Sequence, residues 1–117
     1  MALLPTFQLK ESSLSELKAA LIRKGYTVNC TKEQAIQRNG NTLYREWLLQ
    51  DENGIRVIFW DKCSASDRLG ERQCIITIAS PDGCQGKDLL GKVIEVLISF
   101  GATDLVLLKK CESMAIQ

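Results

Sequence analysis

The sequence contains no histidine among its 117 residues. Without an imidazole, the chain has no Ser–His or Cys–His pair with which to activate a nucleophile. Its five cysteines form no CxxC pair, whereas structural zinc sites usually contain closely spaced Cys or His ligands. Carboxylate pairs such as Asp61 and Asp67 are explained equally well as solvated loop charges. We therefore expect a protein that has no metal site, needs no cofactor and is not an enzyme.

An excess of charge of either sign is also missing. Fifteen Lys and Arg residues balance fourteen Asp and Glu residues, which leaves a net charge of +1. Nucleic-acid-binding domains usually carry a basic excess or a basic stripe, but here the basic residues are spread along the chain. Nucleic acid is therefore not the expected partner. The hydrophobic fraction of 45% and the charged fraction of 25% are typical of a globular chain and argue against disorder.

Long hydrophobic runs are missing as well. The longest apolar stretch, residues 89–100, is interrupted by Gly91, Lys92, Glu95 and Ser99. It falls well short of the roughly 20 apolar residues that span a bilayer. The N-terminal residues have neither the charged region nor the apolar run of a secretory signal. From these observations we expect a cytoplasmic protein that does not enter a membrane.

The cysteines are expected to be reduced, as thiols normally are in the cytoplasm. Cys74, within the apolar run 74–78, should be a small buried residue. Cys63 and Cys84 lie in predicted turns and should be exposed thiols. Cys84 is also the one thiol near an expected helix start with a cation close by, Lys87, an arrangement that can lower a thiol pKa. Nothing else in the sequence supports a thiol enzyme, so binding remains the expected function.

The length suits one domain, residues 1–117, with a single two-layer core. Two helices, at about residues 13–24 and 86–100, alternate with five to six strands that include a central hairpin at residues 42–62. This order predicts an α+β sandwich in which a mostly antiparallel sheet carries both helices on one face. The last strand–helix–strand unit should cross over right-handed and add a parallel pair of strands.

Several element boundaries can be predicted from short signals. Ser13 opens a capping box for the first helix, and Gly25 and Gly101 are placed to end the two helices in a left-handed conformation. Residues 31–40 fit either a single helical turn or a loop. Residues 103–110 are continuously apolar at their centre and predict a last short strand.

The central hairpin has a strong turn signal, Asn53–Gly54, between two runs of aromatic and β-branched residues. A two-residue loop at this step would place Trp47 opposite Trp60 and stack the two indoles across the strands. A four-residue loop would shift every pair. We favour the first register. The following apolar run, residues 74–78, should be buried on both faces of the sheet.

Aromatic and basic side chains of this hairpin form the first candidate binding surface. Its members are Tyr44, Arg45, Trp47 and Trp60. Phe59 and Trp60 are consecutive, so they point to opposite faces of the strand. An outward-facing Trp or Tyr is typical of the centre of a protein–protein interface. The interleaved basic residues also fit stacking of a single-stranded nucleic acid on the sheet, which we keep as a further alternative.

A second candidate site is the strand-to-helix loop at residues 80–88, SPDGCQGKD. Gly86 and Lys87 match a phosphate-binding loop, but Pro81 and Asp88 stand where that motif has Gly and Ser or Thr. Proline lacks the N–H that would bind phosphate, and the Asp88 carboxylate would repel it. We therefore interpret the loop as a turn. The helix start with Gly86 and Lys87 remains a weak anion site, which makes binding of a small molecule or an anion the alternative function.

The helix at residues 86–100 is apolar over more than half of its circumference, which exceeds what one sheet face requires. The first helix or a second copy of the chain would cover the excess. Gly91, in mid-helix, suggests a close backbone approach at this position. We expect a small, non-catalytic binding or accessory protein whose partner is another protein or itself in a homodimer.

Overall fold

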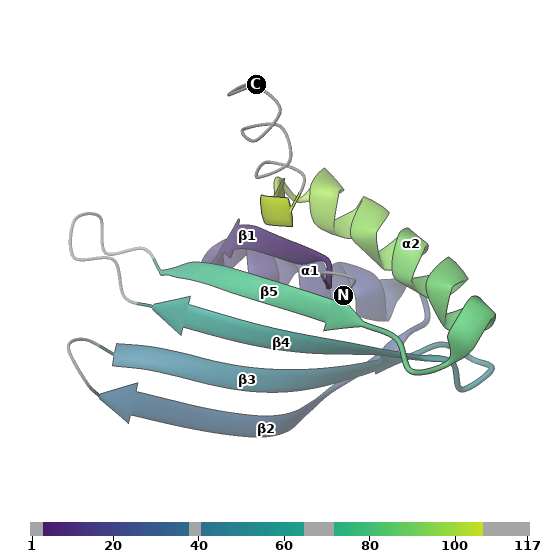
Figure 1. Ribbon diagram of the computed structural model, residues 1–117, viewed down its shortest axis with the longest axis horizontal. Helices are drawn as coiled ribbons and strands as arrows, with labels where there is room; N and C mark the ends of the chain where they lie inside the picture. Colours follow the sequence, from purple (N-terminus) through teal and green to yellow (C-terminus); the bar gives the residue numbers. More distant parts are fainter. Residues whose placement is uncertain (1–3, 38–40, 65–71, 107–117) are drawn as a thin grey trace.

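The computed structural model describes residues 4–37, 41–64 and 72–106. Its elements are β1 (Thr6–Lys10), α1 (Glu11–Arg23), β2 (Thr27–Gln37), β3 (Asn41–Gln50), β4 (Arg56–Ser64), β5 (Gln73–Ala79), α2 (Gly83–Ser99) and β6 (Thr103–Asp104). The six strands form one sheet in the order β2-β3-β4-β5-β1-β6, and the two helices pack on one of its faces (Figure 1). The α+β sandwich predicted from the sequence is therefore confirmed.

Every pair of neighbouring strands in this sheet is antiparallel, so the predicted parallel pair is wrong. Strand β1 lies between β5 and β6 and pairs antiparallel with both. Strands β5 and β6 consequently run in the same direction without touching. The insertion of β1 is explained by its side chains, because Phe7 and Leu9 are both buried at this position.

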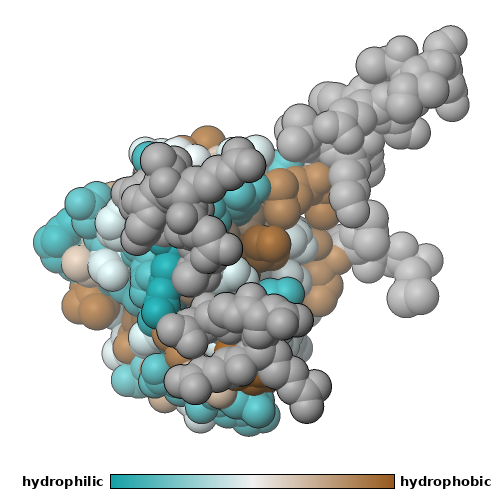
Figure 2. Space-filling model, turned by 90° about the vertical axis from the view of Figure 1, so that its left-hand side faces the viewer, coloured by the Kyte–Doolittle hydropathy of each residue, from teal (hydrophilic) through white to brown (hydrophobic). Residues whose placement is uncertain are grey.

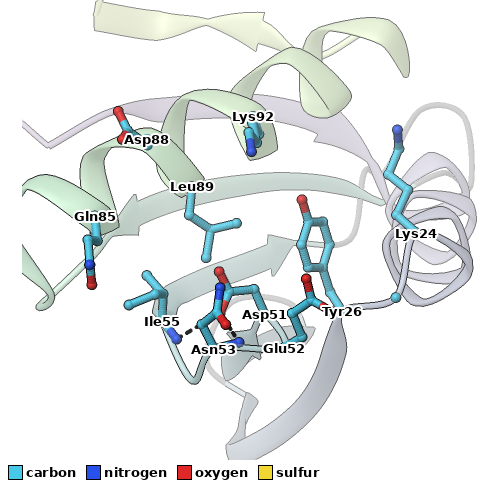
Figure 3. A pocket seen from close by; sticks show the side chains of 11 residues that line it. Lys24, Tyr26, Asp51, Glu52, Asn53, Ile55, Gln85, Asp88, Leu89 and Lys92 are labelled. Atoms are coloured by element: carbon cyan, nitrogen blue, oxygen red, sulfur yellow. Dashed lines mark hydrogen bonds between the residues drawn. The ribbon is translucent and has the colours of Figure 1, made fainter.

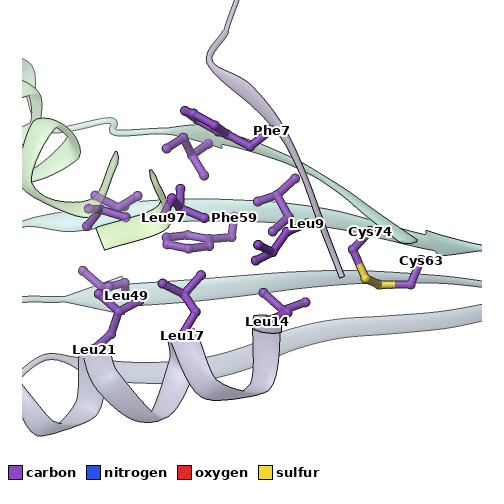
Figure 4. Packing of buried hydrophobic residues seen from close by; sticks show 14 of the residues in the cluster. Phe7, Leu9, Leu14, Leu17, Leu21, Leu49, Phe59, Cys63, Cys74 and Leu97 are labelled. Atoms are coloured by element: carbon purple, nitrogen blue, oxygen red, sulfur yellow. A yellow bond between two sulfur atoms is a disulfide. The ribbon is translucent and has the colours of Figure 1, made fainter. Parts of the chain in front are cut away.

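A hydrophobic core fills the space between the sheet and the helices (Figure 4). The helices contribute Leu14, Leu17 and Leu21 from α1 and Leu89, Val93 and Leu97 from α2. These spacings place each set on one helix face. Each such side chain contributes about 1.5–3 kcal/mol when fully buried. The buried residues of both helices thus follow helical periodicity.

The strands bury only the face that carries the helices. In β5, Cys74 and Ile76 are fully buried, whereas the intervening Ile75 is 43% exposed. The prediction that this run is buried on both faces is therefore wrong. Alternate side chains of a strand point to opposite faces, and no described element covers the second face. One face of the sheet is left open to solvent.

Helix α1 begins at Glu11, and the predicted capping box at Ser13 is wrong. The N-cap residue is Lys10, which makes no side-chain cap. The Glu11 N–H instead donates to the Arg72 carbonyl at 3.0 Å, so the ladder between β1 and β5 continues into the first helical residue. After the C-terminal ends of α1 and α2, Gly25 (φ 99°) and Gly101 (φ 88°) adopt the predicted left-handed conformation.

Strand β2 continues to Gln37. The residues from 31 to 37, expected to form a helical turn or a loop, continue the pairing with β3. A bulge between Cys30 and Lys32 places Thr31 outside the ladder, and its hydroxyl donates to the Glu46 carbonyl at 3.1 Å. The predicted last strand is shorter than expected, since β6 contains only Thr103 and Asp104 and residues 107–110 lie outside the described residues.

The β3–β4 hairpin adopts neither of the two expected registers. Trp47 pairs with Phe59 rather than with Trp60. The chain turns through three residues, 52–54, because the Asp51 N–H donates to the Ile55 carbonyl at 3.0 Å. The Asp51 carboxylate accepts the N–H groups of residues 53 and 55, both at 2.9 Å, and Gly54 takes a φ of 80°. This one-residue difference turns Trp47 and Trp60 to opposite faces of the sheet.

Cys63 and Cys74 form a disulfide, so the expectation of reduced thiols is wrong for this pair (Figure 4). The two residues face each other across β4 and β5, and both are fully buried. The burial of Cys74 is confirmed. The predicted exposure of Cys63 is wrong because the alternation of β4 turns it toward the core. Cys84 is exposed with a free thiol, as expected, and so is Cys30.

Removal of this disulfide should lower the free energy of unfolding. The bond joins residues 11 positions apart, and the loss of so short a cross-link costs about 2–3 kcal/mol through the entropy of the unfolded chain. We expect the double variant Cys63→Ala/Cys74→Ala to unfold at a correspondingly lower urea concentration, as followed by circular dichroism. The control Cys30→Ala/Cys84→Ala removes two exposed thiols and should change stability by less than about 0.5 kcal/mol. Equal midpoints for the two double variants would contradict this account.

Candidate functional site

The sheet face opposite the helices carries the strongest candidate surface. Two rows of side chains cross it from β2 to β1 through directly paired residues. The first row is Gln34, Tyr44, Lys62, Ile75 and Gln8, and the second is Lys32, Glu46, Trp60, Thr77 and Thr6. Within these rows Tyr44, Trp60 and Ile75 are exposed by 37%, 38% and 43%. We call the surface formed by the two rows the open face.

Polar contacts hold the central Trp60 of the open face. Its indole N–H donates to Glu46 Oε2 at 3.1 Å. The same carboxylate accepts the Thr31 hydroxyl through Oε1 at 3.0 Å and lies 3.9 Å from the Lys32 ammonium. In the neighbouring row, the Lys62 ammonium lies 5.8 Å from the centre of the Tyr44 ring. The indole and the carboxylate are therefore oriented by one another, and a shallow hollow of about 670 Å³ remains over the two rows.

Two of the predicted surface residues lie on the other face. Trp47 and Arg45 point toward the helices, where both bind the carboxylate of Asp61. The Trp47 indole donates to Asp61 Oδ2 at 2.6 Å, and Arg45 Nε donates to Asp61 Oδ1 at 3.1 Å. Lys18 of α1 completes the group, with its ammonium 3.1 Å from the centre of the Trp47 ring. We call these four residues the Asp61 cluster.

Asp61 is only 3% exposed and is the one charged residue buried among those described. Its interpretation as a solvated loop charge is wrong, and Asp67, its proposed companion, lies outside the described residues. Two bonds from Arg45 and Trp47 compensate for the loss of water around the carboxylate. The sequence contains a signal for this position, since Asp61 alternates with Phe59 and Cys63 on the core face of β4.

The Asp61 cluster changes the acidity of Lys18. Burial, followed by the positive charge of Arg45, lowers the pKa of Lys18 from 10.5 to about 8. Coulombic interactions with Asp61, Cys30 and Glu11 partly oppose this change. Two cations thus lie against one indole ring, since the Arg45 guanidinium is 5.6 Å from the same ring centre. The sequence gives no sign of this, because Lys18 occupies an ordinary polar position of an amphipathic helix.

The loop at residues 80–88 is tied to the start of β4. Asp82 accepts the Arg56 backbone N–H at 2.7 Å and its Nη2 at 2.9 Å, and the Ser80 hydroxyl donates to the Arg56 carbonyl at 2.5 Å. This ion pair lowers the pKa of Asp82 and raises that of Arg56. Helix α2 begins at Gly83, earlier than predicted, and the Asp82 carboxylate stands immediately before it. The Asp82 carboxylate is bound to Arg56 and makes no side-chain cap on the helix, and its negative charge next to the helix start disfavours a bound anion.

The two anion-binding candidates of this loop differ in their surroundings. Gly86 is buried, and a Cβ at this position would collide with the Ser80 side chain, so the glycine is required by packing. Lys87 is exposed.

Gly91 is also exposed, and nothing within 4 Å would meet a Cβ there, so the close backbone approach predicted at this glycine is wrong for the described residues.

A polar pocket of about 480 Å³ lies between the end of α1, the β3–β4 turn and α2 (Figure 3). Tyr26, Ile55 and Leu89 supply its apolar walls. Its charged lining residues are Lys24, Asp51, Glu52, Asp88 and Lys92. Three carboxylates and two ammonium groups line it, so the pocket has no strong charge of one sign. Of the predicted loop site at residues 80–88, Gln85 and Asp88 line this pocket, whereas Gly86 and Lys87 do not.

Hydrophobic side chains are exposed elsewhere too, but on separate elements. Leu4, Ile22 and Ile98 are exposed by 47%, 55% and 54%. Seen from the end of the sheet at which β2 and β4 finish, hydrophobic residues are interspersed with hydrophilic ones over the coloured surface (Figure 2). Among the described residues, the open face alone combines a tryptophan, a tyrosine and an aliphatic side chain on adjacent strands.

Comparisons with known proteins give no relative. No family model matches the chain, and neither a curated protein nor a solved structure is significantly similar to it. Among the described residues no helix is both long and apolar enough to cross a membrane, and no three His, Cys, Asp or Glu side chains come together as a metal site would require. The interpretation of the site therefore depends on its geometry.

The lowered pKa of Lys18 predicts an unusual dependence of stability on pH. Between pH 8 and 10.5 the unfolded chain holds a proton on this amine that the folded chain has released, so stability should rise with pH in this interval. The rise should be about 1 kcal/mol, because the amine is only half-buried and solvent screens part of the effect. Urea unfolding at pH 7 to 10 measures it. We expect Lys18→Met to remove the rise and Lys92→Met, at an exposed position, to keep it. If the free energy of unfolding of the wild type changed with pH in the same way as that of Lys18→Met, the prediction would be wrong.

Proposed function

We propose that the protein is a non-catalytic binding protein that docks another protein on the open face. The observation that carries the proposal is the exposure of Tyr44, Trp60 and Ile75 on adjacent strands of a face that no described element covers. Trp and Tyr dominate the binding energy of protein interfaces, where they form an apolar centre within a polar rim. Here Gln8, Gln34 and the two lysines of the rows supply such a rim.

The charges of the open face favour a protein over a single-stranded nucleic acid. Nucleic-acid-binding sheets combine exposed aromatic rings with a row of cations for the phosphates. The centre of the open face instead holds the Glu46 carboxylate, which would repel a phosphate next to Trp60. Lys32 is already paired with Glu46. Lys62 remains the one cation of the two rows that forms no ion pair with a described residue.

The same charges indicate what the partner presents. An apolar side chain would cover Trp60 and Ile75, and a neighbouring Asp or Glu would pair with Lys62. A second copy of the chain would not supply this acid from its own open face, because Glu46 is the one carboxylate there and is already bound. Strand β2, at the sheet edge, is a poorer docking element, since its bulge and its charged Lys32 and Glu33 oppose strand addition. We therefore favour a different protein over a homodimer.

The location in the cell also belongs to this proposal. A cytoplasmic location, expected from the sequence, requires the Cys63–Cys74 disulfide to persist in a reducing compartment. Both cysteines are fully buried, which denies a reductant access to the sulfur atoms in the folded protein. We keep the cytoplasm as the proposed location on this basis.

Substitution of Trp60 should abolish partner binding without unfolding the protein. The experiment compares the wild-type protein with Trp60→Ala and with Ile22→Ala, whose side chain is also exposed (55%, against 38% for Trp60) but lies on α1. Each immobilised protein captures partners from its host's lysate, and the affinity of every captured protein is then measured after purification. We expect a partner whose Kd rises roughly 30-fold or more with Trp60→Ala, the size of a hot-spot effect, and is unchanged with Ile22→Ala. Circular dichroism verifies the fold of both variants.

Three results would overturn the proposal. Equal affinity of Trp60→Ala and the wild type for every captured protein would remove the open face as the docking surface. A concentration-dependent dimer of the wild type that Trp60→Ala disrupts would make the partner a second copy. Tight, salt-dependent binding of a labelled single-stranded oligonucleotide that Trp60→Ala abolishes would make it a nucleic acid.

A further inference from the structure

The hollow in the open face is longer across the strands than along them. Its lining residues come from four adjacent strands, β2 to β5, but span no more than three consecutive positions of each. Three strand spacings give the hollow a length of about 14 Å, whereas three positions along a strand cover only about 7 Å. An element that fills this hollow therefore crosses the strands instead of running parallel to them.

The exposed hydrophobic side chains follow the same direction. Tyr44 and Ile75 both pair with Lys62, so they lie in one row, two strand spacings or about 10 Å apart. Trp60 lies in the second row, on the intervening strand β4. The three side chains form a narrow triangle, and the rows continue beyond it with polar residues of β2 and β1.

An element that covers this triangle cannot bond to the backbone of the sheet. The backbone groups of β3, β4 and β5 are directed at neighbouring strands in the plane of the sheet and not at the open face. An extended segment lying there would bury its own N–H and C=O groups against Trp60 and Ile75 without partners, which is costly. An α-helix satisfies these groups internally and presents a narrow apolar stripe, whereas a second sheet would need a wider apolar face.

Building on the docking function proposed above, we infer that the partner binds the open face through an amphipathic α-helix that lies across β3, β4 and β5. Seven residues of a helix rise about 10 Å, so its residues i and i+7 reach Tyr44 and Ile75. A third apolar residue, at i+3 or i+4, covers Trp60 between them. The occupant is thus defined by the spacing of its apolar residues.

The charges of the open face add an acidic residue to this spacing. Lys62 stands between Tyr44 and Ile75 in one row. Glu46 stands beside Trp60 in the other row. Positions i+3 and i+4 lie on opposite sides of the helical stripe, so one of them meets Trp60 and the other meets Lys62. An Asp or Glu at the second position pairs with Lys62 and stays away from the Glu46 carboxylate. The direction in which the helix runs decides which of the two positions is acidic.

A phage-displayed library of random peptides of about 16 residues, or roughly four helical turns, tests this pattern on the full-length protein. The library is passed over Trp60→Ala, which removes peptides that bind elsewhere, and is then selected on the wild type. We expect the enriched sequences to share apolar residues at i and i+7, a third at i+3 or i+4, and an Asp or Glu at the remaining position. A synthetic peptide of the enriched sequence should become helical on binding, as measured by circular dichroism. Its Kd should rise roughly 30-fold with Trp60→Ala.

The variant Lys62→Glu checks the position of the acidic residue. We expect it to weaken binding of the peptide about tenfold, because two carboxylates then face each other. A peptide whose acidic residue is changed to Lys should recover the affinity for this variant. Lys92→Glu makes the same change at an exposed position of α2 and should leave the Kd unchanged.

Three results would overturn the helical occupant. Enriched sequences in which apolar and polar residues alternate would show that the face binds an extended segment. A library with no enrichment on the wild type over Trp60→Ala would show that no short helix binds there. An equal effect of Lys62→Glu and Lys92→Glu would remove the acidic residue from the pattern. The lysate capture judges the docking function separately, because a protein that Trp60→Ala fails to bind supports docking on the open face whatever the shape of its docked segment.

Discussion

The pairing of Asp61 with Arg45 and Trp47 determines which side chains of the β3–β4 hairpin are buried against the helices and which are exposed on the opposite face. A buried carboxylate is tolerated only where donors replace the water that it has lost. Arg45 lies directly opposite Asp61 in the sheet and supplies one of these donors. A slip of one residue, the register in which Trp47 faces Trp60, would set Asp61 opposite Glu46. Two carboxylates would then meet at the buried position, and every side chain of β3 would change face relative to β4.

The consequences of this register extend to both layers of the molecule. On the helix side, Trp47 becomes the surface against which Lys18 of α1 rests. On the solvent side, Trp60 stands next to Glu46 at the centre of the open face. The interior polar cluster and the proposed docking surface are therefore two results of one strand alignment. The disulfide between Cys63 and Cys74 secures the next strand pair, β4 with β5, two residues from Asp61.

Patterns that depend on one segment were predictable from the sequence. Both helices were predicted, and Gly25 marked the end of α1. The alternation of Phe59 and Trp60 indicated that one of them faces outward, and Trp60 does. The sheet with both helices on one face followed from the order of these elements. Such features arise from local geometry, which the sequence carries directly.

Features that depend on partners far along the chain were not predictable in the same way. The insertion of β1 between β5 and β6 is decided by the burial of Phe7 and Leu9 against the rest of the core. The hairpin register is decided by Asp61, which a turn signal at Asn53–Gly54 does not reveal. Trp47 and Arg45 were placed on the binding surface because both belong to an aromatic and basic segment, yet their common partner turns them inward.

The accessibility of the two tryptophans tests this register most directly. The single-tryptophan variants Trp47→Phe and Trp60→Phe each leave one indole, whose fluorescence is quenched by acrylamide, a neutral quencher that is insensitive to the nearby charges. The account predicts strong quenching of Trp60, which is 38% exposed, and much weaker quenching of Trp47, which Lys18 and Asp61 enclose. Equal quenching of the two indoles, or stronger quenching of Trp47, would contradict the register and with it the open face.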